Sequence, residues 1–374
     1  MKRNIVFSLF LALILGLACC NKDPKPNDSN EDVASTVFFE EGGAQYIVLT
    51  QESNQRLLFW VLPNDQVALF LGNLSAAQFI AQNEYKGDLS IPSSFTHDGT
   101  TFTVTRISGS HPYSPELTSI KIPNTVKCID WAAFCGCPNL SKVEFQSPSS
   151  LDSIMRDAIL TCRNLEDFEF PNSLKYIGQY AFQESGLKHV SFSNKVAIDE
   201  CAFEYCLNLE SVLLPEGIDT IKTFAFGYCM NLTSVQIPQS AKTIEDFAFI
   251  CAPLNSIILP DSLESIGCNA FSNANITSIK FPNSLKKLGG FSACPGLTEV
   301  TIPSSVKDMD DTAFSYCPNL NKITCLAETP PYSKFDSLFD GTPLTVIYVP
   351  AESVDAYKSA NGWRNYADII QAIN

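Results

Sequence analysis

Short stretches of alternating apolar and polar residues return at a regular interval along most of the chain. In the stretch "LTSVQIP", which ends at Pro238, Val235 and Ile237 alternate with Ser234 and Gln236. This alternation is typical of a β-strand with one buried face. Proline then ends the strand, because it cannot donate a hydrogen bond to a continuing ladder. The sequence therefore predicts many short strands, each exposing one face.

An Ala-Phe pair accompanies each return of the strand pattern. The mean spacing is about 22 residues, which lies within the range of leucine-rich repeats. Ile159 and Phe291 take the place of the pair's phenylalanine in two divergent units. The phenylalanines that mark the other units are Phe134, Phe182, Phe203, Phe226, Phe249, Phe271 and Phe314.

A single unit of this length cannot bury enough apolar surface to fold alone, so we expect the units to stack in an array with capped ends. Strand-like runs such as "RLLFWVL" predict a β-rich N-terminal cap over residues 36–84. The repeat array is expected over residues 85–325, in about ten units. The stripe of Val354, Tyr357, Trp363, Tyr366 and Ile370 predicts a helical C-terminal cap over residues 326–374.

The first residues have the composition of an export signal. Lys2 and Arg3 precede an apolar run over residues 5–17. A membrane-spanning helix needs about 20 apolar residues, and this run is shorter. We therefore expect residues 1–18 to be a signal peptide that is removed on export.

The stretch that follows the apolar run resembles the lipobox of bacterial lipoproteins, in which the signal is cut before a cysteine that is then lipidated. Cys19 follows "GLA" and is the expected lipidated residue, with Cys20 as the alternative. Residues 19–35 are polar and lack aromatic residues, so they are expected to form a flexible tether. The resulting prediction is an exported lipoprotein of the outer membrane, displayed on the cell surface.

The combination "LTSVQIP…TIEDFAF…C" resembles the BspA-type leucine-rich repeat family of bacterial surface proteins. The stretches "YKGDLSIPSSF" and "GTPLTVIYVPAESVDAYK" resemble the flanks of many members. The resemblance extends from about Tyr85 to the C-terminus. It implies a leucine-rich repeat solenoid, a curved right-handed coil dominated by strands with short helical or 3-10 turns. It also implies binding or adhesion to host or bacterial surfaces, and it supplies no catalytic residues.

Recurring cysteines could indicate either a metal or redox site or a core position. Zinc sites need closely spaced pairs, which the chain does not repeat. One cysteine per unit at one register is typical of a core ladder that takes a small hydrophobic residue. Cys251 lies one residue out of this register. The cysteines three residues after the phenylalanine position are Cys137, Cys162, Cys206, Cys229, Cys294 and Cys317.

Charge and the remaining motifs narrow the function classes. The formal net charge is −15, whereas nucleic acids and anionic lipid surfaces require a basic face. We therefore expect no nucleic-acid partner and membrane contact only through the lipid anchor. His97, His111 and His189 fall at unrelated repeat positions, which disfavours a catalytic triad. No metal or cofactor is expected, and the chain is expected to be a monomer.

The outward strand face is the candidate binding surface, because solenoids commonly bind along their strand face. Two features distinguish it. One is a run of acidic residues on neighbouring coils, Glu144, Asp167 and Glu169, called the acidic step. The other is a pair of apolar residues, Leu213 and Ile258, at positions that are otherwise polar. The candidate residues are Glu144, Asp167, Glu169, His189, Leu213, Gln236, Ile258 and Lys280.

Three functions fit these features. The favoured one is a non-catalytic surface protein that binds a host or bacterial protein or glycan. The alternative is a secreted carbohydrate-active hydrolase or its glycan-binding accessory lipoprotein. A purely structural or immune-decoy surface protein is the third.

Overall fold

A computed structural model describes residues 33–41, 44–51, 56–72, 85–110 and 114–373. These residues belong to one compact unit, Asp32–Asn374. The predicted signal peptide, both candidate lipidation sites Cys19 and Cys20, and most of the predicted tether lie outside the described residues.

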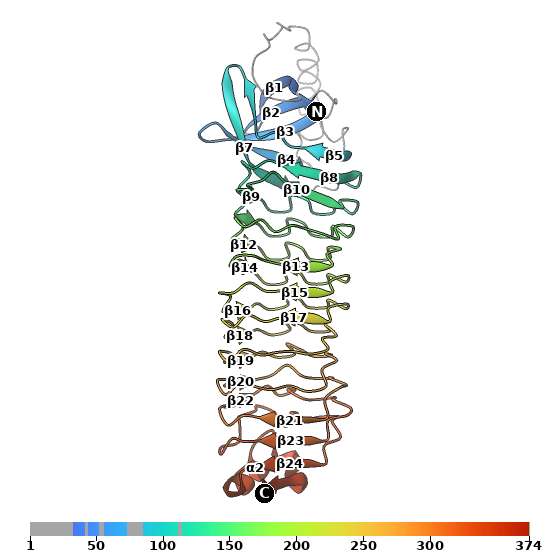
Figure 1. Ribbon diagram of the computed structural model, residues 1–374, viewed down its shortest axis with the longest axis vertical. Helices are drawn as coiled ribbons and strands as arrows, with labels where there is room; N and C mark the ends of the chain where they lie inside the picture. The colour runs from blue at the N-terminus through green and yellow to red at the C-terminus, as the bar shows by residue number, and fades with distance from the viewer. Residues whose placement is uncertain (1–32, 42–43, 52–55, 73–84, 111–113, 374) are drawn as a thin grey trace, which may run out of the picture. The chain divides into compact units, whose positions relative to one another are not determined.

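An antiparallel sheet precedes the repeats (Figure 1). Its strands are β1 (Val33–Glu41), β2 (Ala44–Gln51), β3 (Arg56–Leu62) and β4 (Gln66–Gly72). The last of these pairs in parallel with β7 (Thr100–Ser110), which also pairs with β6 (Ser94–His97). The sheet therefore joins the repeat array through its own hydrogen bonds.

The repeats form a β-solenoid of about 11 turns, in which two parallel ladders run along the array (Figure 1). Most coils supply one strand to each ladder, and a turn separates the two strands. The strands of the first ladder are β5 (Gly87–Ser90), β8 (Leu117–Ile122), β10 (Lys142–Phe145), β13 (His189–Ser191), β15 (Ser211–Leu213), β17 (Ser234–Gln236), β21 (Glu299–Ile302), β23 (Lys322–Cys325) and β24 (Val346–Val349). The strands of the second are β9 (Cys128–Ile129), β11 (Ser153–Ile154), β12 (Tyr176–Ile177), β14 (Ala197–Ile198), β16 (Thr220–Ile221), β18 (Thr243–Ile244), β19 (Ser265–Ile266), β20 (Lys287–Leu288) and β22 (Asp308–Met309).

A column of phenylalanine rings fills the centre of the solenoid. Phe226 has no exposed surface and stacks between Phe203, at 5.3 Å, and Phe249, at 5.5 Å between ring centroids. Its backbone N–H donates to the Ala248 carbonyl of the next coil at 2.9 Å. The Ala-Phe pair recurs because the small residue lets neighbouring coils approach while the ring fills the gap between them. The prediction that this residue belongs to the core is confirmed.

The repeating cysteines belong to the same core. The six at the predicted register are buried, whereas Cys251 is half-buried. The Cys229 thiol donates to the Phe203 carbonyl of the preceding coil at 3.3 Å, and the Cys206 thiol does the same to Phe182 at 3.2 Å. All the cysteines in the described residues are free. This position in the repeat therefore takes a small side chain that also donates a hydrogen bond to a buried carbonyl of the preceding coil.

The last coils end in a compact cap. Its elements are η2 (Ala351–Ser353), α2 (Val354–Ser359), η3 (Arg364–Ile369) and β25 (Ile370–Ala372). Tyr357 and Trp363 have no exposed surface, and each donates a hydrogen bond to a backbone carbonyl, of Ala327 at 2.7 Å and of Pro331 at 3.0 Å. The sequence predicts a second short helix there. The structure has a 3-10 helix that continues into a strand paired with β24, so the first ladder extends through the cap.

Candidate functional site: the outward strand face

The outward side chains of the first ladder form two columns, which together are called the outward strand face. The first column consists of the outward residue at the start of each strand, and the second consists of the residue two positions later. In-register pairing aligns Ser211 with Ser234, and Leu213 with Gln236. Where no strand is assigned, backbone hydrogen bonds such as Asn255 N–H to the Thr233 carbonyl continue the alignment. Residues far apart in the sequence therefore lie side by side.

Seven of the eight predicted residues are exposed, and Glu144 is half-buried. The first column holds Asp167 and His189. The second column holds Glu144, Glu169, Leu213, Gln236, Ile258 and Lys280. The exposure of seven of them is observed, whereas their role in binding stays a prediction.

The predicted acidic step is partly balanced by lysines. Glu144 pairs with Lys142 on the same strand, and Lys121 lies opposite Glu144 on the neighbouring strand. The hydrogen bond from Lys142 lowers the pKa of the Glu144 carboxyl. Sequence reasoning missed this balance, because Lys121 becomes a neighbour of Glu144 only through the pairing of β8 with β10. Asp167 and Glu169 complete the acidic step, and Lys188 lies close enough for the charge of Asp167 to act on it.

His189 contacts a serine of the neighbouring strand. Its Nδ1 atom lies 2.9 Å from the Ser211 hydroxyl, and both side chains reach solvent. A neighbouring pair, Lys188 and Glu166, is 2.6 Å apart and ties two coils together. A charged cross-coil pair beside the histidine fits a polar surface better than a reaction centre.

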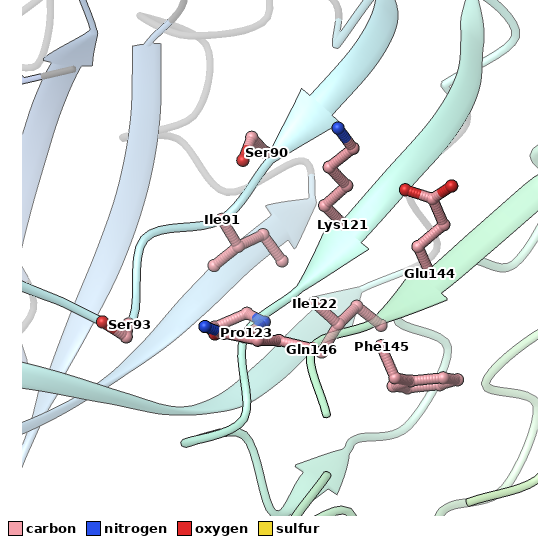
Figure 2. Close-up of a pocket in the computed structure, with 9 residues that line it drawn as sticks. All are labelled: Ser90, Ile91, Ser93, Lys121, Ile122, Pro123, Glu144, Phe145 and Gln146. Carbon is pink, nitrogen blue, oxygen red and sulfur yellow. The ribbon is translucent and has the colours of Figure 1, made fainter. Parts of the chain in front are cut away.

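A shallow hollow lies at the N-terminal end of the outward strand face, where β5, β8 and β10 end (Figure 2). Its volume is about 370 Å³. The side chains of Lys121 and Glu144 extend to the same side of neighbouring strands (Figure 2). The lining residues are Ser90, Ile91, Ser93, Lys121, Ile122, Pro123, Glu144, Phe145 and Gln146. Of these, sequence reasoning identified only Glu144; the shared column position of Ser90 and Lys121 could have indicated both.

The middle of the face combines hydroxyl groups with two apolar side chains. Ser211, Ser234 and two further serines occupy successive places in the first column, while Leu213 and Ile258 project from the second. The exposed fraction of Leu213 is 43%, and that of Ile258 is 80%. An exposed apolar side chain among hydroxyl groups offers contact area without charge, which suits recognition by contact rather than acid–base chemistry.

Two features of the described residues bear on metal and thiol chemistry. No group of three or more His, Cys, Asp or Glu side chains there could hold a metal ion. Burial raises the pKa of the Cys206 thiol to about 12, which keeps the thiol protonated and unreactive near neutral pH. Among the residues that the structure describes, no helix is both long and apolar enough to cross a membrane.

The coil length, the paired ladders and the recurring leucines define a leucine-rich repeat protein. The chain matches the model of the BspA type leucine rich repeat region (6 copies) over residues 105–223, 187–290 and 244–360. These segments cover more than half of the 374-residue chain, and the chain belongs to this family. No curated protein matches it.

A solved bacterial structure shares the fold, and a second shows a weaker likeness. A leucine-rich repeat protein from Bacteroides ovatus is 24% identical, with a TM-score of 0.64 over 79% of this chain and 76% of that chain. A leucine rich cell surface protein from Faecalibacterium prausnitzii is 21% identical, with a TM-score of 0.41 over 87% of this chain and 98% of that chain. The first of these likenesses supports the β-solenoid fold.

Proposed function

We propose that the protein is a lipid-anchored binding protein of the bacterial cell surface. In this proposal the outward strand face recognises a host or bacterial protein or glycan, without catalysis. Export and anchoring rest on the signal-like N-terminus and on Cys19, or Cys20, as the lipidated residue. The protein acts as a monomer, has no cofactor and has no nucleic-acid partner.

The exposure of Ile258 and Leu213 is the observation that carries this proposal. Both side chains project from a face that is otherwise polar. Burying the exposed apolar area of such side chains against a partner contributes about 25 cal/mol per Å² before the costs of association. The serine column beside them supplies hydroxyl donors and acceptors at the spacing of adjacent strands.

Binding arrays would test the proposal. The purified protein is probed against arrays of glycans and of surface proteins, together with a Leu213→Asp/Ile258→Asp variant and a Lys242→Asp control. Lys242 is exposed in the turn before β18, outside the outward strand face. We expect the double variant to lose at least about tenfold in affinity and the control to keep it.

Two results would contradict the proposal. Equal binding by the double variant and the wild type would remove the outward strand face from recognition. Turnover of any arrayed glycan would favour the hydrolase instead.

A further inference from the structure

An exposed apolar patch lies in the turn segments that follow β14, β16 and β18, outside the outward strand face. It is called the turn-face patch. Its residues are Tyr205, Leu207, Phe224, Tyr228, Met230 and Phe247. The exposed fraction is 40% for Tyr205, 52% for Leu207 and 50% for Met230. Three successive coils contribute these side chains.

The four aromatic rings of the patch form one continuous surface. The rings of Tyr205 and Tyr228 stack with centroids 4.7 Å apart, and those of Phe224 and Phe247 stack at 4.8 Å. Phe224 also lies 6.3 Å from Tyr228, which joins the two pairs. Gly227 makes this arrangement possible, because a Cβ atom there would come within 3.0 Å of the Phe224 ring.

These aromatic residues occupy backbone positions that disfavour them. Tyr205, Phe224, Tyr228 and Phe247 all have φ between 53° and 60°. Bulky L-residues rarely adopt this left-handed conformation, whereas Gly, Asn and Asp adopt it more readily. The same conformation recurs at the equivalent positions of other coils, which hold residues as different as Asn273, Glu184 and Tyr316. The left-handed conformation therefore belongs to the repeat, and the patch is distinguished by the stacking and partial exposure of its four rings.

The chemistry of the patch favours a protein partner. Aromatic residues and methionine are enriched at protein interfaces, and tyrosine is frequent among the residues that dominate binding energy. In each stacked pair, one face of each ring is covered by the other ring, so that face is withdrawn from solvent. This arrangement disfavours a ligand that needs open ring faces, and it favours side chains that pack against ring edges.

The charges around the patch restrict the partner further. Two cations of these and the preceding turns are paired, Arg163 with Glu184 and Lys222 with Glu245, the latter pair at 3.3 Å. Glu200 and Asp246 are exposed in the same turn segments, whereas Glu204, beside Tyr205, is buried. The rim is therefore acidic and complements a basic surface. A second copy of this chain would bring the same acidic rim against it, in a protein of net charge −15.

We propose that the turn-face patch docks a segment of a partner protein that carries aromatic or aliphatic side chains flanked by Lys or Arg. This surface is separate from the outward strand face and does not depend on it.

A random peptide library displayed on phage provides the probe. Selection on the full chain is compared with selection on a Tyr205→Asn/Tyr228→Asn variant, and Tyr316→Asn is the matched control. Tyr316 occupies the position equivalent to Tyr228, with φ 57°, in a coil remote from the patch. Asparagine suits this backbone conformation, so both variants should fold, and circular dichroism melting checks that they do.

We expect peptides enriched on the wild type to pair aromatic or aliphatic residues with Lys or Arg. Their affinity should fall at least about tenfold on the double variant and less than about threefold on the control. Binding should also weaken when the salt concentration rises from about 50 mM to about 500 mM. Equal binding to the double variant, or enriched peptides without basic residues, would overturn the proposal. So would patch-dependent dimers in analytical ultracentrifugation, because they would make a second copy the occupant.

Discussion

Replacing Phe226 by alanine removes a ring at the centre of the core column. The side chain has no exposed surface and contacts the rings of Phe203 and Phe249 on either side. Truncation of such a buried phenylalanine costs about 3–5 kcal/mol in free energy of unfolding. The two lost stacking contacts account for part of this, at about 0.5–1.5 kcal/mol each.

The loss should be local. The stability of a repeat array is close to a sum of terms for each coil and for each interface between neighbouring coils. The coils that hold Phe203, Phe226 and Phe249 should therefore open more readily, while the terminal coils keep most of their stability.

Hydrogen exchange followed by mass spectrometry measures this effect along the chain. Protection should fall over residues 203–249 in the Phe226→Ala variant. Gln236→Ala is the control, because that side chain is exposed on the outward strand face, and it should change stability by less than about 0.5 kcal/mol. Full protection of the middle coils in Phe226→Ala, or loss of protection in Gln236→Ala, would show that the assignment of inward and outward positions is inverted.

Three further predictions concern a turn, a thiol and the N-terminus. Gly186→Ala should destabilise the fold by about 1–3 kcal/mol in chemical denaturation, because its Cβ would lie 2.2 Å from the Arg163 carbonyl oxygen. Burial raises the pKa of the Cys206 thiol to about 12, so the unfolded chain loses this proton at lower pH than the folded chain. The free energy of unfolding should therefore fall as the pH rises from about 9 towards 12, and less steeply in Cys206→Ala. Metabolic labelling with a fatty-acid probe should mark the wild type, and a Cys19→Ser/Cys20→Ser variant that kept the lipid would refute the proposed anchor.

Much of the fold is predictable because the repeat imposes the same packing problem on every coil. The spacing of residues such as Ile237 and Phe226 defines the buried face, since only that register places both side chains inside. The Cys229 thiol is predictable as a core residue by the same argument. Its hydrogen bond to the Phe203 carbonyl is not, because that bond depends on the offset between coils.

The candidate surfaces are less predictable. Exposure of Ile258 follows from the strand alternation, but the balance of Glu144 by Lys121 depends on which strands pair. The turn-face patch was missed because Tyr205 and Tyr228 lie in turns, where no period-two alternation marks a surface. Their stacking arises from the coil-to-coil contact at a left-handed backbone position, and the sequence spacing of 23 residues was its only signal.

Photo-crosslinking on living cells tests the central claim most directly, namely that the outward strand face binds a partner. A photoreactive amino acid is placed at the position of Ile258, and in a control protein at that of Lys242, which is exposed outside this face. Binding through the outward strand face predicts a discrete crosslinked species for position 258 and none for position 242. The same adduct from both positions, or adducts from position 242 alone, would contradict it.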